Sequence, residues 1–392
     1  MYPRRNDNDV TYLARVDFRN DQRVFGIRRR DRRSHMYLIG KTGTGKSTLL
    51  ANMIQQDIVN GEGLAVVDPH GDLVETVIEN VPPSRRKDLI YFDAADSDNT
   101  FGFNPLQHVP PQEHALATSD LLDVFKKIWP DFWGPRLEHF LRNALLALYA
   151  VPGSSLLDVL RLLNDREFRR YAVLHHPVAE VREFWLREYE NYPERLRAEA
   201  ISPIQNKIGA FTSNPYLSRV INSGRDTLDL NEVINGGKIL LVNLSKGKIG
   251  EDTATLLGAF LVARLGRTTF HRASMVEEAR KDFYLYLDEF QTFSTASLAG
   301  MLSELRKYRL NLILAHQFMG QIEDDVRESI LGNAGTIISF RLGLADAEII
   351  AKEFHPVFSA NDLINLPNYH TYLKLMVDGV VSKPFSAATL PS

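Results

Sequence analysis

A glycine-rich octapeptide, GKTGTGKS, occupies residues 40–47 and satisfies the pattern G-x-x-x-x-G-K-[ST]. Glycines allow such a loop to curl until successive backbone N–H groups point inward at phosphate oxygens. The lysine of the pattern, Lys46, reaches the β- and γ-phosphates of a nucleoside triphosphate, and the hydroxyl of Ser47 binds Mg²⁺. We therefore predict that the nucleotide contacts come from Gly40, Thr42, Gly43, Thr44, Gly45, Lys46, Ser47 and Thr48.

The segments on either side of this loop have the periodicity that the pattern requires. An apolar run at Met36–Ile39 predicts a buried strand, and apolar residues recur at helical spacing from about Gly45 to Asn60. Further apolar runs at Leu64–Val67 and Leu89–Phe92 predict the next two strands. Strands that alternate with helices are typical of a parallel sheet covered by helices. The predicted fold class is therefore α/β, with a mainly parallel sheet and an inserted all-α domain.

The alternation of strands and helices stops at about Pro110, and the chain to about Ser223 shows helical patterns without a convincing strand. We divide the chain into a basic N-terminal segment (residues 1–35), a first part of the α/β domain (36–109), an all-helical insertion (110–225) and a second part of the α/β domain (226–392). Aromatic residues of such an insertion are more often core than binding site. We expect buried positions for Phe125, Trp129, Phe132, Trp133 and Phe140.

The α/β pattern resumes after the insertion and continues toward the C-terminus. The apolar runs predict strands at Lys238–Leu244, Phe283–Leu287, Asn311–Ala315 and Thr336–Phe340 and helices at Thr253–Leu265, Ser297–Tyr308, Ile322–Leu331 and Ala345–Phe354. The dipeptide Asp378-Gly379 separates Tyr372–Val377 from Val380–Lys383, and this spacing predicts a hairpin.

Two carboxylates directly follow the strand at Phe283–Leu287. They are Asp288 and Glu289. In a sheet that carries a phosphate loop, such a pair can orient Mg²⁺ through its water shell and polarise the water that attacks the γ-phosphate. Because strands often end in acidic residues at a surface, the pair is informative only together with the loop. We assign the metal role to Asp288, with Ser47, and the catalytic role to Glu289, with Lys46.

Cationic and polar groups must complete a site of this kind, because charge spreads over the transferred phosphoryl group. Arg306 follows the acidic pair and is our candidate for an arginine finger supplied to a neighbouring subunit; a solvated helix arginine is the alternative. Gln317 follows the strand at Asn311–Ala315 and is our candidate for a γ-phosphate sensor; a plain turn residue is the alternative. The rival arginines are Arg309, Arg327 and Arg341.

Composition excludes several classes of protein. The 392 residues include no cysteine, which excludes disulfide frameworks and thiolate metal sites. The net charge of −3 gives no support to an overall basic protein that coats nucleic acid, although the first 35 residues carry ten arginines against five aspartates, a net of +5. That excess is either a solvated edge or a surface for phosphate or another subunit. No run approaches the ~20 apolar residues that span a bilayer, so we expect no membrane span and a soluble, cytoplasmic protein.

Further motifs carry a resemblance to a known family. They are DPHGD at residues 68–72, FGFNPL at 101–106, DEFQ at 288–291 and Gln317 after its strand. Their combination and order resemble the HerA/FtsK superfamily of P-loop ATPases. Within it the chain is most similar to the coupling proteins of conjugative type IV secretion, the TraG/TraD-like DNA-binding domains. The resemblance extends from about Phe25 to Met376, and it departs from the membrane-bound coupling proteins in showing no transmembrane helix.

The resemblance implies a RecA-like core, ATP and Mg²⁺ as cofactors, and a homo-hexameric ring that moves DNA through its pore. It also implies that Arg306, in an Arg-Lys-Tyr context, is the finger and that Gln317 is the sensor. Asp68 resembles a residue near the nucleotide. DNA in a pore should meet short basic loops, so Lys246 and Lys248, after a predicted strand, are candidates for DNA contacts. An ordinary exposed loop is the alternative for these lysines.

The predicted function is an ATP-dependent DNA translocase of the coupling-protein type, in conjugative transfer or mobile-element function. A relaxase or a secretion-channel protein would be its partner and would bring it to a membrane. Two alternatives stay open: a HerA-like motor for DNA processing or phage defence with a nuclease partner, and a secretion ATPase that moves protein without DNA. A scaffold that binds nucleotide without hydrolysis is disfavoured by the intact Lys46, Ser47, Asp288 and Glu289.

Overall fold

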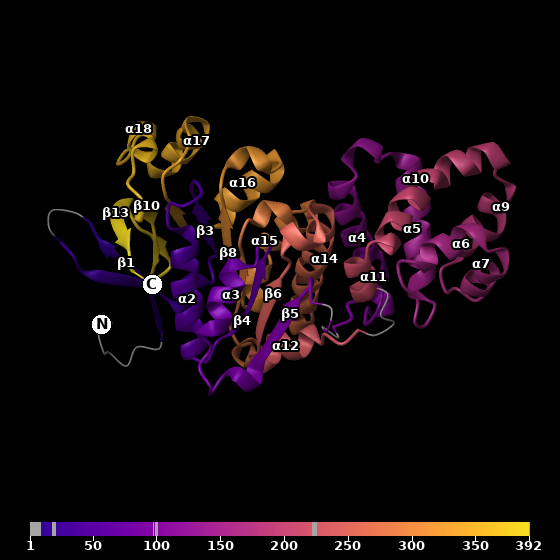
Figure 1. The fold of residues 1–392 in the computed structure, drawn as a ribbon, viewed down its shortest axis with the longest axis horizontal. Helices are drawn as coiled ribbons and strands as arrows, with labels where there is room; N and C mark the ends of the chain where they lie inside the picture. Colours follow the sequence, from indigo (N-terminus) through magenta and orange to yellow (C-terminus); the bar gives the residue numbers. More distant parts are fainter. Residues whose placement is uncertain (1–8, 18–20, 97, 99–100, 222–225, 392) are drawn as a thin grey trace. The chain divides into compact units, whose positions relative to one another are not determined.

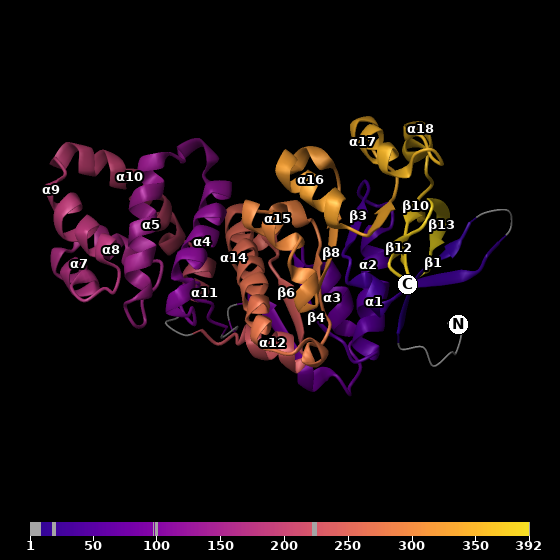
Figure 2. The same ribbon diagram turned by 180° about the vertical axis from the view of Figure 1, so that it is seen from behind.

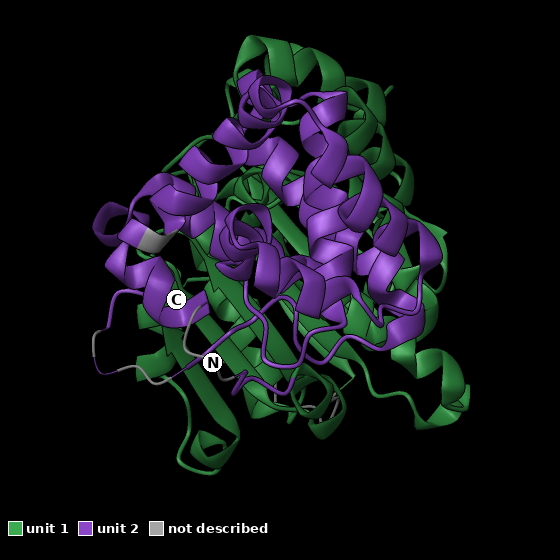
Figure 3. Cartoon of the chain, turned by 90° about the vertical axis from the view of Figure 1, so that its right-hand side faces the viewer, with its two compact units in different colours: residues 1–93, 230–245, 265–392 green, residues 94–229, 246–264 purple. Residues whose placement is uncertain are grey.

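The computed structural model describes residues 9–17, 21–96, 98, 101–221 and 226–391. The chain forms two units, drawn in green and purple in Figure 3. Unit 1 comprises residues 1–93, 230–245 and 265–392, and unit 2 comprises residues 94–229 and 246–264. The insertion expected over residues 110–225 falls within unit 2, which extends beyond it at both ends and also takes in residues 246–264.

A large sheet forms the centre of unit 1. Within the described residues it has 11 strands in the order β2-β1-β13-β10-β9-β3-β8-β7-β4-β6-β5. The seven strands from β9 to β5 pair in parallel, and β10, β13, β1 and β2 pair antiparallel at one side. The strands are β1 Val10–Val16, β2 Val24–Arg28, β3 Met36–Ile39, β4 Gly63–Asp68, β5 Leu89–Asp93, β6 Ile239–Asn243, β7 Phe283–Leu287, β8 Leu310–His316, β9 Thr336–Ser339, β10 His370–Lys374 and β13 Phe385–Thr389.

The central strands are apolar on both faces, as expected of parallel strands that helices cover on both sides. Helices α2 (Lys46–Val59) and α3 (Asp72–Glu79) cover one face, and α12 (Leu230–Gly236) and α15 (Ala296–Leu302) cover the other (Figures 1 and 2). Apolar residues of α2 and α3 pack with alternate strand residues in one core. The α/β class and the mainly parallel sheet are therefore confirmed.

The other helices of unit 1 lie mainly toward the C-terminal part of the chain. They are α1 Arg29–Arg32, α16 Asp324–Asn333, α17 Leu344–Phe354 and α18 Ala360–Ile364, together with the end of α14 Glu251–Phe270. The helix expected at Ser297–Tyr308 is shorter than predicted: α15 ends at Leu302, and a 3₁₀ turn at Leu305–Tyr308 leads into β8.

The predicted C-terminal hairpin is confirmed. Strands β11 (Met376–Val377) and β12 (Val380–Val381) pair antiparallel. Asp378 and Gly379 between them have φ values of 52° and 81°. Two successive residues with positive φ are the requirement of a type I′ turn, and the Asp-Gly dipeptide meets it.

The arginine-rich N-terminal segment is part of the sheet domain, because β1 and β2 extend the sheet beyond β13. Arg32 is only 1% exposed and forms a bidentate ion pair with Asp57 of α2 at 2.6 and 2.9 Å. Its guanidinium also donates to the Tyr286 hydroxyl at 2.7 Å and lies 3.8 Å from the centre of the Tyr284 ring. This arginine thus joins the helix that follows the phosphate loop to strand β7.

Other arginines of the segment also have acidic partners within unit 1. Arg29 pairs with Glu62, and Arg33 forms two hydrogen bonds with Asp282 at 2.9 and 2.8 Å. The net charge of +5 is therefore neutralised in part by carboxylates that lie far away in the sequence. Arg4, Arg5 and Arg19 lie outside the described residues.

The described residues of unit 2 form helices and connecting segments and contain no strand. Its helices are α4 His114–Ile128, α5 Pro135–Tyr149, α6 Asp158–Asn164, α7 Arg166–Val173, α8 Ala179–Glu183, a π-helical turn Phe184–Glu188, α9 Tyr189–Asn191, α10 Glu194–Ser213, α11 Pro215–Ile221, α13 Lys246–Ile249 and the first part of α14.

Three of the five aromatic residues that we expected to be buried in the helical insertion are core residues of unit 2. Phe125, Trp129 and Phe140 are at most 3% exposed, and the rings of Phe125 and Trp129 stack with centres 4.7 Å apart. The expectation is wrong for Phe132, which is 58% exposed because it ends the 3₁₀ turn Pro130–Phe132 between α4 and α5. Trp133 is half-buried. Across the part of the chain that the structure describes, the helices are too short or too polar to cross a membrane.

Candidate nucleotide site

The carboxyl ends of the parallel strands meet at one edge of the unit 1 sheet, where open α/β sheets bind their ligands. Strand β8 lies between β3, which leads into the phosphate loop, and β7, which leads into the acidic pair. Ile39 of β3 is opposite His316 of β8, and Leu287 of β7 is opposite Leu314. The residue after β8, Gln317, therefore lies between the phosphate loop and Glu289.

A pocket of about 520 Å³ lies at this edge. It is lined by Thr42, Gly43, Gly45, Lys46, Ser47, Thr48, Ala51, Asp68, His70, Asp72, Leu73, Thr76, Asp288, Glu289, Gln317 and Tyr369. The structure thus brings most of the predicted nucleotide, metal and catalytic residues together around one cavity. Gly40 and Thr44 are not among the lining residues.

Gly40 and Thr44 contribute to the shape of the phosphate loop instead. A Cβ atom at Gly40 would lie 2.5 Å from Cβ of Phe340, so that only glycine fits there. Thr44 is fully buried, and its hydroxyl donates to the carbonyl of Lys41 at 2.7 Å. The ammonium of Lys46 donates to the carbonyls of Gly40 at 2.5 Å and Lys41 at 3.2 Å, which holds it against the inside of the loop.

The acidic pair is fixed by hydrogen bonds from neighbouring amides. Gln317 Nε2 donates to Glu289 Oε1 at 2.7 Å, and Gln291 Nε2 donates to Glu289 Oε2 at 2.6 Å. Thr42 Oγ1 donates in turn to Gln317 Oε1 at 2.9 Å. A chain of side chains therefore runs from the phosphate loop through Gln317 to Glu289. Glu289 itself has φ of 48°, a conformation that non-glycine residues adopt mainly where the surroundings hold them.

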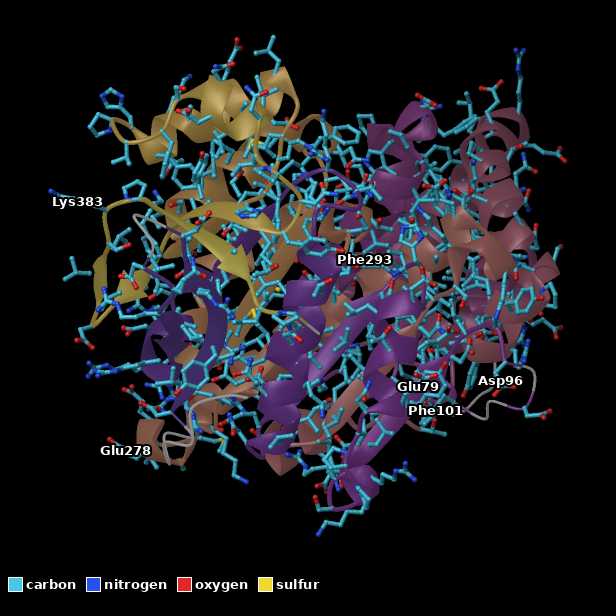
Figure 4. All side chains as sticks on the ribbon, turned by 60° about the vertical axis from the view of Figure 1, so that its left-hand side comes forward. Glu79, Asp96, Phe101, Glu278, Phe293 and Lys383 are labelled. Atoms are coloured by element: carbon cyan, nitrogen blue, oxygen red, sulfur yellow. The ribbon has the colours of Figure 1, made fainter. Side chains whose placement is uncertain are left out.

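The segment after the acidic pair is anchored in the interior. Phe290 and Phe293 are at most 1% exposed. Glu278 precedes β7 in the sequence and Phe293 follows it, and the two residues are labelled far apart in Figure 4. The position of Glu289 is thus set by a buried strand on one side and buried rings on the other.

Buried charges shift the pKa values of two site residues. Burial, together with the nearby charges of Asp68 and Glu289, raises the pKa of the Asp288 carboxyl to about 7. Burial lowers the pKa of the Lys46 ammonium, and the carboxylates of Glu289 and Asp288 oppose that shift. A divalent cation beside Asp288 would relieve the repulsion among these carboxylates.

The donor set fits Mg²⁺ with a bound triphosphate. Asp288 and the exposed Ser47 line the pocket and offer oxygen ligands. Mg²⁺ usually takes only one or two protein ligands and completes its shell with water and phosphate oxygens. The described part of the chain has no cluster of three or more histidine, aspartate or glutamate side chains arranged to hold a metal by themselves.

Asp68 at the end of β4, and His70 and Asp72 just after it, line the same pocket. The Asp68 carboxylate accepts hydrogen bonds from the backbone N–H groups of His70 at 2.8 Å and Leu73 at 2.9 Å, so it orders the turn into α3. His70 and Asp72 are exposed side chains in the pocket wall.

Arg306 lies away from this pocket, in the exposed 3₁₀ turn that precedes β8. Burial lowers the pKa of His35 to about 4, and the nearby charge of Arg306 contributes to this shift. Since His35 immediately precedes β3, Arg306 lies at the amino-terminal edge of the sheet, opposite the nucleotide edge. A finger role for Arg306 therefore requires a neighbouring subunit.

The rival arginines occupy other places in unit 1. Arg309 also precedes β8. Arg327 pairs with Asp324 on α16 at 2.9 Å. Arg341 is at the nucleotide edge, where its carbonyl accepts from the Lys41 N–H at 2.9 Å, but its guanidinium donates to Asn368 at 2.8 Å.

Lys246 and Lys248 belong to unit 2. The loop expected there is wrong, because Lys246–Ile249 forms the short helix α13, whose last residue, Ile249, is buried. Lys248 is exposed and Lys246 is half-buried.

Tyr369 is a pocket residue that the sequence reasoning missed. Tyr369 immediately precedes β10 and lies more than 300 residues beyond the phosphate loop. It has no motif around it, so no sequence signal placed it beside Gly45. Only the antiparallel pairing of β10 with β9 brings it to the pocket.

Comparisons with known proteins agree with this geometry. The family model for the central domain of helicase HerA matches residues 29–265. No curated protein matches the sequence.

Among solved structures, VirB4 of Thermoanaerobacter pseudethanolicus has a TM-score of 0.67 at 16% identity, over 99% of this chain and 98% of its own. The plasmid coupling protein TrwB in complex with a non-hydrolysable ATP analogue has a TM-score of 0.65 at 16% identity, over 96% of this chain and 89% of its own. TrwB in complex with ADP and Mg²⁺ has a TM-score of 0.65 at 16% identity, over 97% of this chain and 90% of its own. At these identities the likeness establishes a common fold.

Proposed function

The chain belongs to the family defined by the central domain of helicase HerA, and from this premise we propose that it is an ATPase motor that forms a homo-hexameric ring and translocates DNA. The observation that carries the proposal is the placement of the phosphate loop, the acidic pair and Gln317 around one pocket. Each of these groups has a separate task in phosphoryl transfer to water.

The proposed tasks follow from the positions of the side chains. The loop N–H groups and Lys46 bind the phosphates, and Ser47 and Asp288 hold Mg²⁺, which neutralises charge on the phosphates when it is bound. Glu289 orients the attacking water and accepts its proton. Gln317 contacts the γ-phosphate region and, through Thr42, the phosphate loop.

In this proposal the site needs a second copy of the chain, which supplies an arginine to the pocket. The pocket of unit 1 contains Lys46 as a cation, and Arg306 is at the far edge of the sheet. In a closed ring each subunit would present its Arg306 to the pocket of its neighbour. That arrangement supplies the positive charge that a loose phosphoryl-transfer transition state needs.

We propose the coupling-protein type of motor, in conjugative transfer or mobile-element function, because TrwB, a plasmid coupling protein, has the same fold over almost the whole chain. A relaxase or a secretion-channel protein would be the partner. A HerA-like motor with a nuclease partner, or an ATPase that moves protein, would have the same pocket, so the test must separate these functions.

The test is the steady-state rate of ATP hydrolysis with and without single- and double-stranded DNA. We expect DNA to increase the rate, and the increase to fall steeply with salt because binding releases counterions. A rate that stays unchanged across a broad range of DNA concentration would refute the DNA function and favour a motor that moves protein.

The lysines of α13 allow the DNA contact to be tested separately. Lys246→Ala/Lys248→Ala should lower the ratio of the stimulated to the unstimulated rate. The matched control is Lys87→Ala/Lys383→Ala, two exposed lysines of unit 1; Lys383 is labelled in Figure 4. An equal fall of both rates in the α13 variant would point to a folding defect and refute the contact.

A further inference from the structure

The pocket is lined by a tyrosine on the side away from the acidic pair. Tyr369 lines it and is 52% exposed, although its backbone is fixed. Its φ of 66° lies in the left-handed region, which bulky residues rarely adopt. Residues held in such conformations cluster at ligand sites, so the position of this ring needs a functional explanation.

Three segments hold Tyr369 in place. Its backbone N–H donates to the carbonyl of Thr44 in the phosphate loop at 2.8 Å. Its carbonyl accepts from the N–H of Thr389 at 2.8 Å and from the hydroxyl of that residue at 3.2 Å. The side chain of the preceding residue, Asn368, accepts from Arg341 at 2.8 Å. The backbone is therefore fastened to the loop, to β13 and to the segment after β9, while the ring itself stays open to solvent.

The ring lies directly against the phosphate loop. A Cβ atom at Gly45 would be 2.9 Å from Cδ1 of Tyr369 and 3.3 Å from Cε1 of Phe340. Glycine at position 45 thus leaves room for the ring beside the first turn of α2. Phe340 is fully buried behind the loop, so Tyr369 is the ring of this pair that a ligand can reach.

The strand order decides which end of a nucleotide would meet this ring. From β3, the acidic pair lies beyond β8, whereas β10 lies on the other side, beyond β9. Because β10 is antiparallel to β9, its first residues come to the carboxyl edge, where the phosphate loop is. A triphosphate whose γ-phosphate faces Glu289 and Gln317 therefore directs its base toward Tyr369.

We propose that Tyr369 is the stacking platform for the base of the nucleotide that binds this pocket. The inference rests on the proposed binding of ATP at the phosphate loop and adds the residue that recognises the base. Stacking uses the face of the base and does not read its edge, so the platform accepts any purine. The Tyr369 hydroxyl is not needed for this contact.

The test compares the binding of ATP with that of inorganic tripolyphosphate, which has no base, by calorimetry in the presence of Mg²⁺. Tyr369→Ala should weaken ATP binding about tenfold or more and leave tripolyphosphate binding within about twofold. Tyr369→Phe should bind ATP as the wild type does. Tyr171→Ala, which removes a similarly exposed tyrosine from unit 2, is the matched control and should change neither affinity.

The outcomes separate stacking from a merely structural role. Equal weakening of ATP and tripolyphosphate in Tyr369→Ala would mean that the residue only shapes the phosphate loop, and it would overturn the proposal. Unchanged binding of ATP would overturn it as well. Tyr369→Leu keeps apolar bulk against Gly45 and gives the same comparison if the alanine variant does not fold. Failure of ATP to bind the wild type would refute the proposed function itself, and this result can be told apart from a failure of the stacking proposal alone.

Discussion

Gln317 donates a hydrogen bond of 2.7 Å from its side-chain amide to the Glu289 carboxylate. The same side chain accepts from Thr42 in the phosphate loop, so it connects the group that would bind phosphate with the group that would activate water. A bound γ-phosphate would compete for this amide. The link offers a physical route by which occupancy of the loop changes the position of the Glu289 carboxylate.

The role of Glu289 predicts a separation of binding from turnover. Glu289→Gln keeps the size of the side chain and its contact with Gln317 but cannot accept a proton. We expect ATP affinity close to that of the wild type and a fall of kcat of about 100-fold or more. Equilibrium binding measures the ATP affinity, and steady-state hydrolysis measures kcat. Glu79→Gln, at an exposed carboxylate on α3 (Figure 4), is the control, and retained turnover in Glu289→Gln would refute the assignment.

The position of Arg306 predicts that active sites form between subunits. Arg306→Ala and Glu289→Gln should each abolish hydrolysis alone, whereas rings mixed from both variants should recover activity. In a randomly mixed ring about one interface in four pairs an intact Glu289 with an intact Arg306 of the neighbour. Lys307→Ala, from the same exposed turn, is the control and should hydrolyse ATP normally. Mixed rings that assemble without recovering activity would exclude a finger in trans.

The raised pKa of Asp288 predicts a dependence of stability on pH. In the nucleotide-free protein this carboxyl keeps its proton up to about pH 7, whereas the unfolded chain loses it near pH 4. The folded state therefore loses stability, on account of this group, as the pH rises from about 4 to 7. Asp288→Asn removes that loss, so the gain in Tm over the wild type should be larger at pH 8 than at pH 5. Thermal unfolding without Mg²⁺ or nucleotide measures it, and equal gains would contradict the buried, protonated state.

The buried Arg32–Asp57 pair predicts a large effect on stability. Arg32→Ala leaves the Asp57 carboxylate buried without its partner, and we expect the free energy of unfolding to fall by about 3–5 kcal/mol. The double variant Arg32→Met/Asp57→Leu should lose less, because no charge is left buried. Urea unfolding provides the measurement. Arg30→Ala, at an exposed pair with Asp378, should change little, and a similar loss in both arginine variants would refute the role given to burial.

Much of the parallel sheet could be predicted because its strands are apolar on both faces and end in recognisable motifs. Strand β7 was predicted with its observed bounds, and the phosphate loop, Asp288, Glu289 and Gln317 followed from their places after strands. These are local signals: each depends on a few consecutive residues and on the rule that carboxyl ends of parallel strands share an edge.

The remaining features depend on contacts between distant parts of the sequence. Nothing near Arg32 indicates that its partner is Asp57, and nothing near Tyr369 indicates that β10 brings it to the phosphate loop. The exposed position of Phe132 depends on a turn between two helices, which the aromatic spacing did not reveal. Contacts between distant segments set these positions, and they override what the local sequence pattern indicates.

The central claim is that ATP hydrolysis in this pocket drives movement along DNA. The most direct measurement is the release of streptavidin from biotin at the end of single- or double-stranded DNA. We expect release by the wild type with ATP and Mg²⁺ on at least one of these DNAs. There should be none with a non-hydrolysable analogue and none with Glu289→Gln. A wild-type protein that hydrolyses ATP but releases no streptavidin from either DNA would contradict the account.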